Sequence, residues 1–152
     1  MEPDAISSMI PALGFALLAL LLAAGIQDAR TREIGNGKNV AIALLAPVWW
    51  WANDLGGGAI QMQLIAAGLV FVLFLIVYCM GQMGGGDVKL IGALALWVPP
   101  AALLPMLVAM SLLGGALTLL MLIDRWRRRT AALPETPYGV AIAIAGMLAV
   151  AN

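Results

Sequence analysis

Two aspartates stand where long apolar stretches of the chain end, and they are the residues best suited to chemistry. Asp28 follows the apolar segment 9–26, and Asp87 directly follows three glycines. Charged side chains at membrane depth are costly and usually functional. Two carboxyl groups that share a low-dielectric site cannot both ionise cheaply, so one keeps its proton. The ionised group can then take a proton from water while the protonated group polarises a peptide carbonyl, which is aspartic-protease chemistry.

The composition excludes most other catalytic chemistry. The chain contains no histidine and a single cysteine, Cys79. These counts rule out Ser-His and Cys-His catalysis and the zinc-protease helix motif. They also rule out a disulfide framework or a Cys-x-x-Cys site within one chain. Any enzymatic activity would have to use oxygen or amine side chains, or a hard cation held by oxygen atoms. For the peptidase chemistry above we expect no metal and no organic cofactor.

The elements that carry these aspartates are predicted to lie in a membrane. The chain is 63% hydrophobic and only 11% charged, which is outside the range of ordinary soluble proteins. A helix needs about 20 residues to cross the hydrocarbon layer, so the first, third and fifth apolar segments are long enough and the others are short. The segments cover residues 9–26, 39–52, 60–80, 88–98, 101–123 and 138–151.

The basic residues predict on which side each polar break lies. All eight follow the first, third and fifth segments, and such short basic loops stay cytoplasmic. If all six segments cross the membrane and both termini lie outside, every basic residue lies on the cytoplasmic side. If segment 88–98 does not cross, alone or together with 39–52, some basic residues lie outside. We therefore expect an all-α polytopic membrane protein with about six transmembrane helices, one domain over 1–152, and both aspartates at the cytoplasmic face. The basic residues are Arg30, Arg32, Lys38, Lys89, Arg125, Arg127, Arg128 and Arg129.

Two further features fit this topology. The N-terminal segment carries Glu2 and Asp4 before its apolar run and no basic residue, so we expect a retained first span rather than a signal peptide. The run Trp49-Trp50-Trp51 fits an aromatic belt at the outer face, which would let the second segment end early.

Each aspartate also has a purely structural interpretation. Asp28 could be a solvated charge at a helix end, paired with Arg32 four residues later. Asp87 could be the N-cap of the fourth helix, where aspartate is favoured. Lys89 is expected beside Asp87, where it either biases which carboxyl is ionised or anchors the chain at the inner face.

The local motifs around both aspartates resemble those of the type IV prepilin peptidases. The segment Gly84-Gly85-Gly86-Asp87-Val88-Lys89-Leu90 resembles the Gly-x-Gly-Asp motif of these membrane aspartyl proteases. Asp28 with Ile34-Gly35-Asn36 resembles their first motif, an Asp followed some six residues later by Ile-Pro-Asn, with Gly35 in place of the usual proline. Pro137-Tyr138-Gly139 resembles the segment that opens the last helix of the short members.

The resemblance implies an endopeptidase of the bacterial inner membrane. Such an enzyme removes the basic leader of prepilins or pseudopilins at the cytoplasmic face, typically after a glycine, for pilus assembly or secretion. Its partners would be that substrate and the lipid bilayer, with no nucleic acid. The longer members carry a Cys-x-x-Cys loop and also N-methylate the product. The chain lacks that loop and is most similar to the short, tight-adherence (Flp-type) form.

The same resemblance suggests roles for individual residues. Asp28 and Asp87 would be the catalytic pair. The glycines at 84, 85 and 86 have no side chains, so a substrate backbone could approach closely there. Asn36 is expected to cap a helix or to hydrogen-bond near Asp28.

Two other classes of function stay open at this point. A small proton- or cation-coupled transporter would use the aspartates as ion sites, but many such folds have inverted halves and we find no convincing internal repeat. A non-catalytic scaffold of a secretion machine would need neither aspartate. The sequence also leaves open the substrate, the oligomeric state, methylation, the distance between the aspartates, and which of them is the base.

Overall fold

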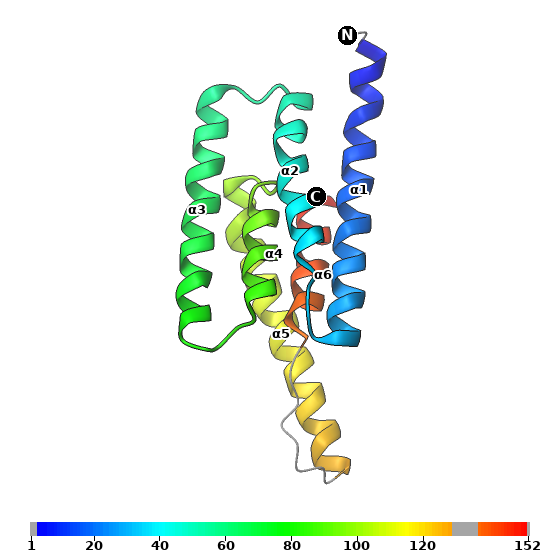
Figure 1. The fold of residues 1–152 in the computed structure, drawn as a ribbon, viewed down its shortest axis with the longest axis vertical. Helices are drawn as coiled ribbons and strands as arrows, with labels where there is room; N and C mark the ends of the chain where they lie inside the picture. The colour runs from blue at the N-terminus through cyan, green and yellow to red at the C-terminus, as the bar shows by residue number, and fades with distance from the viewer. Residues whose placement is uncertain (1–2, 129–136, 152) are drawn as a thin grey trace.

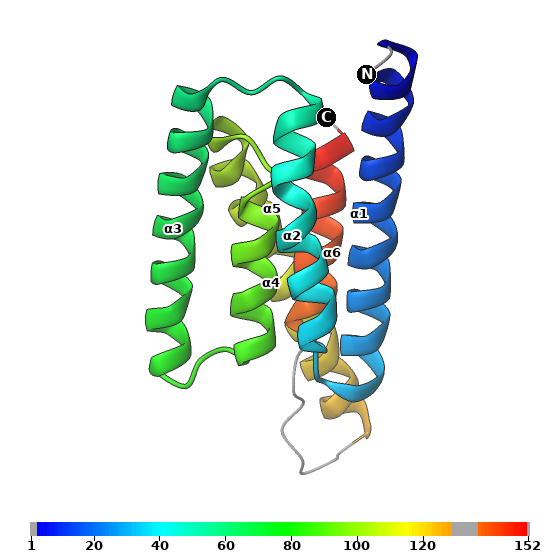
Figure 2. The same cartoon turned by 45° about the horizontal axis from the view of Figure 1, so that its top comes forward.

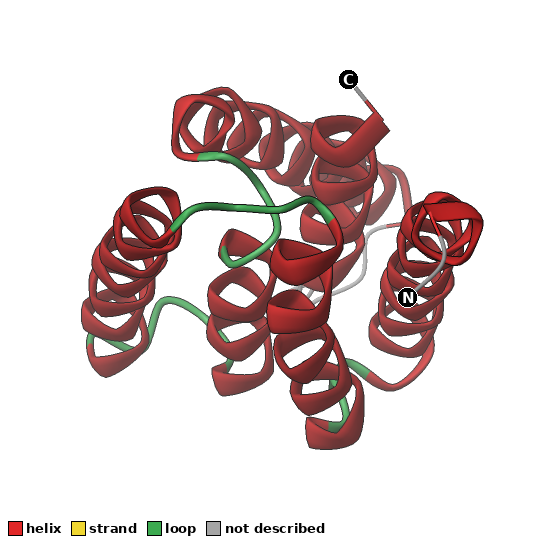
Figure 3. Ribbon diagram, turned by 90° about the horizontal axis from the view of Figure 1, so that it is seen from above, coloured by secondary structure: helices red, strands yellow, loops and turns green. Residues whose placement is uncertain are grey.

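The computed structural model describes residues 3–128 and 137–151, and helices are the only regular secondary structure in this part of the chain. The predicted all-α class is therefore confirmed, and each predicted apolar segment coincides with one helix. Figure 3 shows the helices from above, joined by loops. The helices are α1 (Pro3–Thr31), α2 (Asn36–Ala52), α3 (Gly57–Cys79), α4 (Gly85–Ala95), α5 (Pro100–Arg128) and α6 (Tyr138–Ala151).

The chain runs up and down, so that alternate connections gather at one end of the bundle (Figures 1 and 2). The α1–α2 and α3–α4 connections lie at this end together with the start of α6, while the N-terminus lies at the opposite end. We call this the dyad end, because Asp28 and Asp87 both lie at it. The two shortest helices lie inside the bundle: α4 packs against α2, α3 and α6, and α6 packs against α1 and α5 as well.

Three helices are long and apolar enough to cross a membrane, judged by length and composition. They are the ones that the sequence predicted, and their long spans are Ser8–Thr31, Gly57–Cys79 and Pro100–Asp124. Many large apolar side chains of α3 and α5 are exposed, among them Leu69, Leu73 and Leu112. So many exposed apolar side chains suit contact with lipid rather than with water. That α2, α4 and α6 also cross the bilayer stays a prediction.

The short helix α4 ends inside the bundle because neighbouring helices satisfy its last carbonyl groups. The final carbonyls of a helix have no partner within it, and leaving them unpaired in an apolar surrounding is costly. The buried Gln63 of α3 donates its Nε2 to the carbonyls of Ala95 and Val98, both at 2.7 Å. Trp50 of α2 donates its Nε1 to the carbonyl of Leu96 at 2.8 Å.

The prediction of an aromatic belt at the tryptophan run is wrong for Trp50. That side chain is 7% exposed and hydrogen-bonded to α4, and Trp49 lies against Trp97 with ring centroids 5.4 Å apart. Only Trp51, at 57% exposure, has the outward position of a belt residue. The reason is geometric, because successive residues of a helix point about 100° apart and three in a row cannot share one face.

We predict that Gln63→Leu destabilises the protein by about 2 kcal/mol, because two buried carbonyls lose their donor. Thermal unfolding in detergent, followed by circular dichroism, measures this as a lower Tm. Gln61→Leu, two residues earlier on the exposed side of α3, is the matched control and should leave Tm unchanged. Equal Tm values for the two variants would contradict the capping role of Gln63.

Candidate active site

The structure brings the two predicted aspartates to one cavity at the dyad end. Asp28 lies in the last turn of α1, and Asp87 is the third residue of α4. Both line a cavity of about 250 Å³. The other lining residues come from the connection after α1 and from the glycine run before Asp87: they are Arg32, Glu33, Ile34, Gly84, Gly85 and Gly86. Two helix ends far apart in the sequence therefore form one site.

Both carboxyl groups present an unpaired oxygen. The side chain of Asp28 is only 5% exposed. Oδ2 of Asp28 and Oδ1 of Asp87 are buried and have no hydrogen-bond partner among the described residues. Buried polar atoms in proteins are nearly always paired, so such atoms call for an explanation. In this cavity the two oxygens are available to hold a water molecule or a substrate group.

The start of α4 explains the position of Asp87. Gly84 is the N-cap of this helix, and its backbone amide hydrogen-bonds to the carboxyl of Asp87. An acidic residue at the third helical position commonly reaches back in this way. The structural alternative in which Asp87 is itself the N-cap is therefore wrong. The close approach also suits glycine, since a Cβ at position 84 would lie 3.1 Å from Oδ2 of Asp87.

The surroundings of Asp87 keep its carboxyl protonated at a higher pH than is usual for an aspartic acid. Burial, and next the negative charge of Asp28, raise the pKa of Asp87 from 3.8 to about 6, against a smaller lowering by the Gly84 amide. A buried acid beside a second carboxylate behaves in this way because both effects disfavour its charged form. Asp87 thus carries a proton at a pH where an isolated aspartic acid has lost it.

Asp28 accepts backbone hydrogen bonds from α6. The backbone amides of Gly139 and Val140, in the first turn of that helix, hydrogen-bond to its carboxyl. A Cβ at position 139 would lie 2.8 Å from Cγ of Asp28, so the contact requires glycine there. The alternative in which Asp28 is a solvated charge at a helix end is wrong, because the side chain is buried. The charge of Arg32 does act favourably on its carboxylate.

Ile34 lies between Gly86, at the start of α4, and Gly139, at the start of α6. A Cβ at position 86 would lie 3.1 Å from Cβ of Ile34, and a Cβ at position 139 would lie 2.7 Å from its Cδ1. The connection that carries Ile34 is held to α1 by Gln27, whose Oε1 accepts hydrogen bonds from the Gly35 amide and the Lys38 ammonium. The spacing from Asp28 to Ile34 therefore places one apolar side chain against both α4 and α6.

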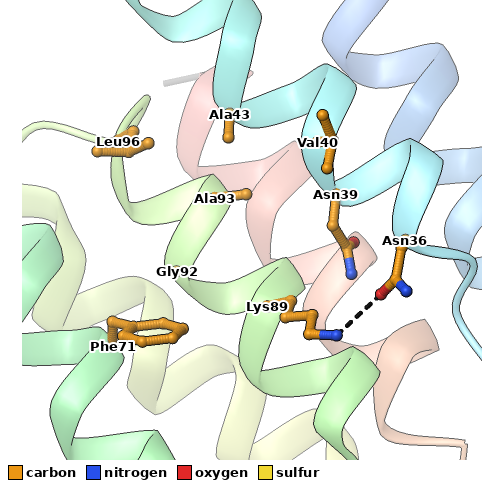
Figure 4. A pocket seen from close by; sticks show the side chains of 9 residues that line it. All are labelled: Asn36, Asn39, Val40, Ala43, Phe71, Lys89, Gly92, Ala93 and Leu96. Atoms are coloured by element: carbon orange, nitrogen blue, oxygen red, sulfur yellow. Dashed lines mark hydrogen bonds between the residues drawn. The ribbon is translucent and has the colours of Figure 1, made fainter.

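Asn36 and Lys89 lie together but away from the dyad cavity. Lys89 Nζ donates to Oδ1 of Asn36 at 2.9 Å, and both line a second pocket of about 390 Å³ between α2, α3 and α4 (Figure 4). Asn36 is the first residue of α2, whose N-cap is Gly35 without a side-chain cap bond. The expectation that Asn36 caps a helix is therefore wrong, and its described partner is Lys89 rather than Asp28.

Asn39 is a site residue that the sequence analysis missed. It is 4% exposed on α2, and its Nδ2 donates to the carbonyl of Gly86 at 3.2 Å. It therefore holds the glycine run that precedes Asp87. An asparagine at the start of an apolar segment was the available signal, but spacing along the chain does not show which carbonyl such an amide meets.

No group of three or more acidic, cysteine or histidine side chains that could hold a metal occurs within residues 3–128 and 137–151. The chemistry that the arrangement supports is acid–base catalysis by a carboxyl pair, in which one member is ionised and the other protonated.

Comparison with known proteins agrees with these motifs. The sequence model of the type IV leader peptidase family matches residues 15–119, which is more than half of the chain. The match includes both aspartates and the three glycines, and it ends before Pro137-Tyr138-Gly139. No curated protein and no solved structure matches the chain. The predicted family is confirmed: the chain belongs to the type IV leader peptidase family, whose members are peptidases.

Proposed function

We propose that the protein is a membrane-embedded aspartic endopeptidase of the bacterial inner membrane. It removes the basic leader of a type IV prepilin or pseudopilin at the cytoplasmic face, using Asp28 and Asp87. The observation that carries this proposal is the single cavity lined by both carboxyl groups, each with a buried oxygen that has no partner among the described residues. The family match supports peptidase activity in general.

The pair supports hydrolysis without a covalent intermediate. One carboxylate takes a proton from water, and the water oxygen attacks the carbonyl carbon of the peptide while the other carboxyl gives its proton to the carbonyl oxygen. The C–N bond of the resulting diol then breaks. The leaving nitrogen takes the proton held by the first carboxyl, and the second carboxyl recovers its proton from a diol hydroxyl.

The glycine run supports access of a peptide to this pair. Residues 84–86 line the cavity without side chains, so an extended peptide backbone can lie close to Asp87. The basic residues at the dyad end support a cytoplasmic site. Arg30 lies in the last turn of α1, and Lys38 and Lys89 lie near the starts of α2 and α4. Short basic connections stay on the cytoplasmic side. Arg129, at the end of the predicted basic cluster, lies outside the described residues.

We predict that Asp28→Asn and Asp87→Asn each lower leader cleavage by about 10²–10⁴-fold, since each removes one acid–base group. Cleavage of a co-expressed prepilin, followed as a shift in gel mobility, measures the loss. Asp54→Asn is the control, because Asp54 is exposed in the connection between α2 and α3, at the end opposite the dyad.

The outcomes separate the classes of function. If either dyad variant inserts normally and still cleaves at the wild-type rate, the carboxyl pair is not the catalyst. Pilus assembly or secretion that survives both substitutions would instead favour a scaffold. Loss of an ion-driven flux with cleavage intact would favour a transporter.

We predict that cleavage falls as the pH rises through about 6, approaching a tenfold loss for each further unit. The pair must keep one proton, and burial and the charge of Asp28 raise the pKa of Asp87 to about 6, so the working form is lost above that pH. The pH profile of kcat/KM in detergent, between about pH 4.5 and 8.5, measures this limb. A rate that increases steadily from pH 6 to 8 would show that the reaction does not need a protonated member of the pair.

We predict that Gly86→Ala lowers kcat/KM by at least about tenfold. The new methyl group would lie 3.1 Å from Cβ of Ile34 and displace the start of α4, and small displacements of catalytic groups are costly. Gly37→Ala is the matched control, because a Cβ there meets no atom within 4 Å. Equal kcat/KM for the two variants would show that the approach of Gly86 to Ile34 does not position Asp87.

A further inference from the structure

The two carboxyl groups have unequal hydrogen-bond donors. The carboxyl of Asp28 accepts hydrogen bonds from the backbone amides of Gly139 and Val140, whereas that of Asp87 accepts one from the amide of Gly84. The first amides of a helix carry the positive end of the helix dipole. The Val140 amide also donates to the carbonyl of Pro137 at 3.2 Å. Hydrogen bonds from such donors to an ionised acceptor are stronger than those to a neutral one. The start of α6 therefore favours a negative charge on Asp28, against the burial of its side chain, which is the larger effect and disfavours that charge.

Among the charged groups around the site, the cation favours a negative charge on Asp28, whereas the acidic groups oppose it. Arg32, one turn after Asp28, is the cation whose charge acts on that carboxyl. The other ionisable groups of the cavity wall are Glu33, from the connection after α1, and Asp87, from α4. On α6 the contacts to Asp28 come from backbone amides, and the ring of Tyr138 lies against Gly114 of α5.

Close packing of α1 against α6 makes this contact possible. A Cβ at position 139 would lie 2.8 Å from Cγ and 2.9 Å from Cβ of Asp28, so any larger residue would push the carboxyl away. One turn earlier on α1, a Cβ at Gly25 would lie 3.2 Å from Cβ of Ala143. Glycines on both helices bring the amides of α6 within reach of Asp28.

From this geometry we propose that the first turn of α6 assigns the roles of the pair, with Asp28 as the ionised base, Asp87 as the protonated acid, and Gly139 as the positioning residue that holds Asp28 in its ionised form. The assignment rests on the proposed aspartic-peptidase function and adds the role of each carboxyl to it. It also gives a function to Pro137-Tyr138-Gly139, a motif that lies outside the part of the chain matched by the family. The negative charge of Asp28 raises the pKa of Asp87. Asp28 then ionises first and Asp87 keeps its proton, as the proposed roles require.

The reaction then has a fixed proton path. Asp28 takes a proton from water as the water oxygen bonds to the carbonyl carbon, and Asp87 gives its proton to the carbonyl oxygen. When the C–N bond breaks, the proton on Asp28 goes to the leaving nitrogen. Asp87 takes back a proton from a diol hydroxyl as the new carboxyl group forms. Both residues finish in the states in which they started.

The first test is the pH profile of Gly139→Ala. Loss of the α6 amides from Asp28 should move the acid limb of kcat/KM upward by roughly one pH unit, because the ionised base is less stabilised. Gly146→Ala is the control, since its new methyl group lies on the same helix but meets the side chain of Leu94 on α4 rather than Asp28. It should change Tm but neither limb. A Gly139→Ala enzyme that loses activity equally at every pH would overturn the positioning role.

The second test needs no activity. Protein labelled with ¹³C at the aspartate carboxyl carbons is titrated in detergent, and the resonances of the dyad are assigned by their absence from Asp28→Asn and Asp87→Asn. The resonance missing from Asp28→Asn should ionise at the lower pH in the wild-type protein. The reverse order would overturn the assignment. If the titration gives the expected order but neither variant loses cleavage, the proposed peptidase mechanism fails while the order of ionisation stands.

Discussion

The burial of the Asp28 carboxyl against the start of α6 is the constraint on which the dyad end depends. A buried carboxyl needs donors, and Asp28 finds them in the amides of a helix that begins more than 100 residues later in the chain. Those amides can reach it only if residue 139 has no side chain. Ile34 then fills the space between the glycines of α4 and α6. Packing and electrostatics therefore fix the same geometry.

Polar side chains hold α4, which carries the second carboxyl, at both of its ends. Asn39 of α2 donates to Gly86 at the start, and Gln63 and Trp50 donate to the carbonyls at the end. In an apolar bundle each of these bonds is strongly favoured, because the alternative is an unpaired buried group. Only 11 residues long, α4 can thus be placed firmly among α2, α3 and α6. This placement fixes Asp87 relative to Asp28.

Most of the helical layout could be predicted from the sequence. Each apolar segment became a helix, because long runs of apolar residues between polar breaks leave few alternatives in a membrane. The orientation of single residues could not be predicted in the same way. The tryptophan run was expected to face outward as a group, yet Trp50 turns inward to bond α4. Its partner, Leu96, lies 46 residues away, and no local pattern records that contact.

The sequence by itself determined which residues carry the chemistry. With no histidine and one cysteine, the aspartates at the ends of apolar segments and the glycines before Asp87 were the candidates that composition left. Only the tertiary structure decided how they are arranged. It brought Asp28 and Asp87 to one cavity, joined Asn36 to Lys89 beside a separate pocket, and brought α6 to Asp28. The physical reason is that residue types set the cost of burying each group, whereas its partners come from distant parts of the chain and are chosen by packing.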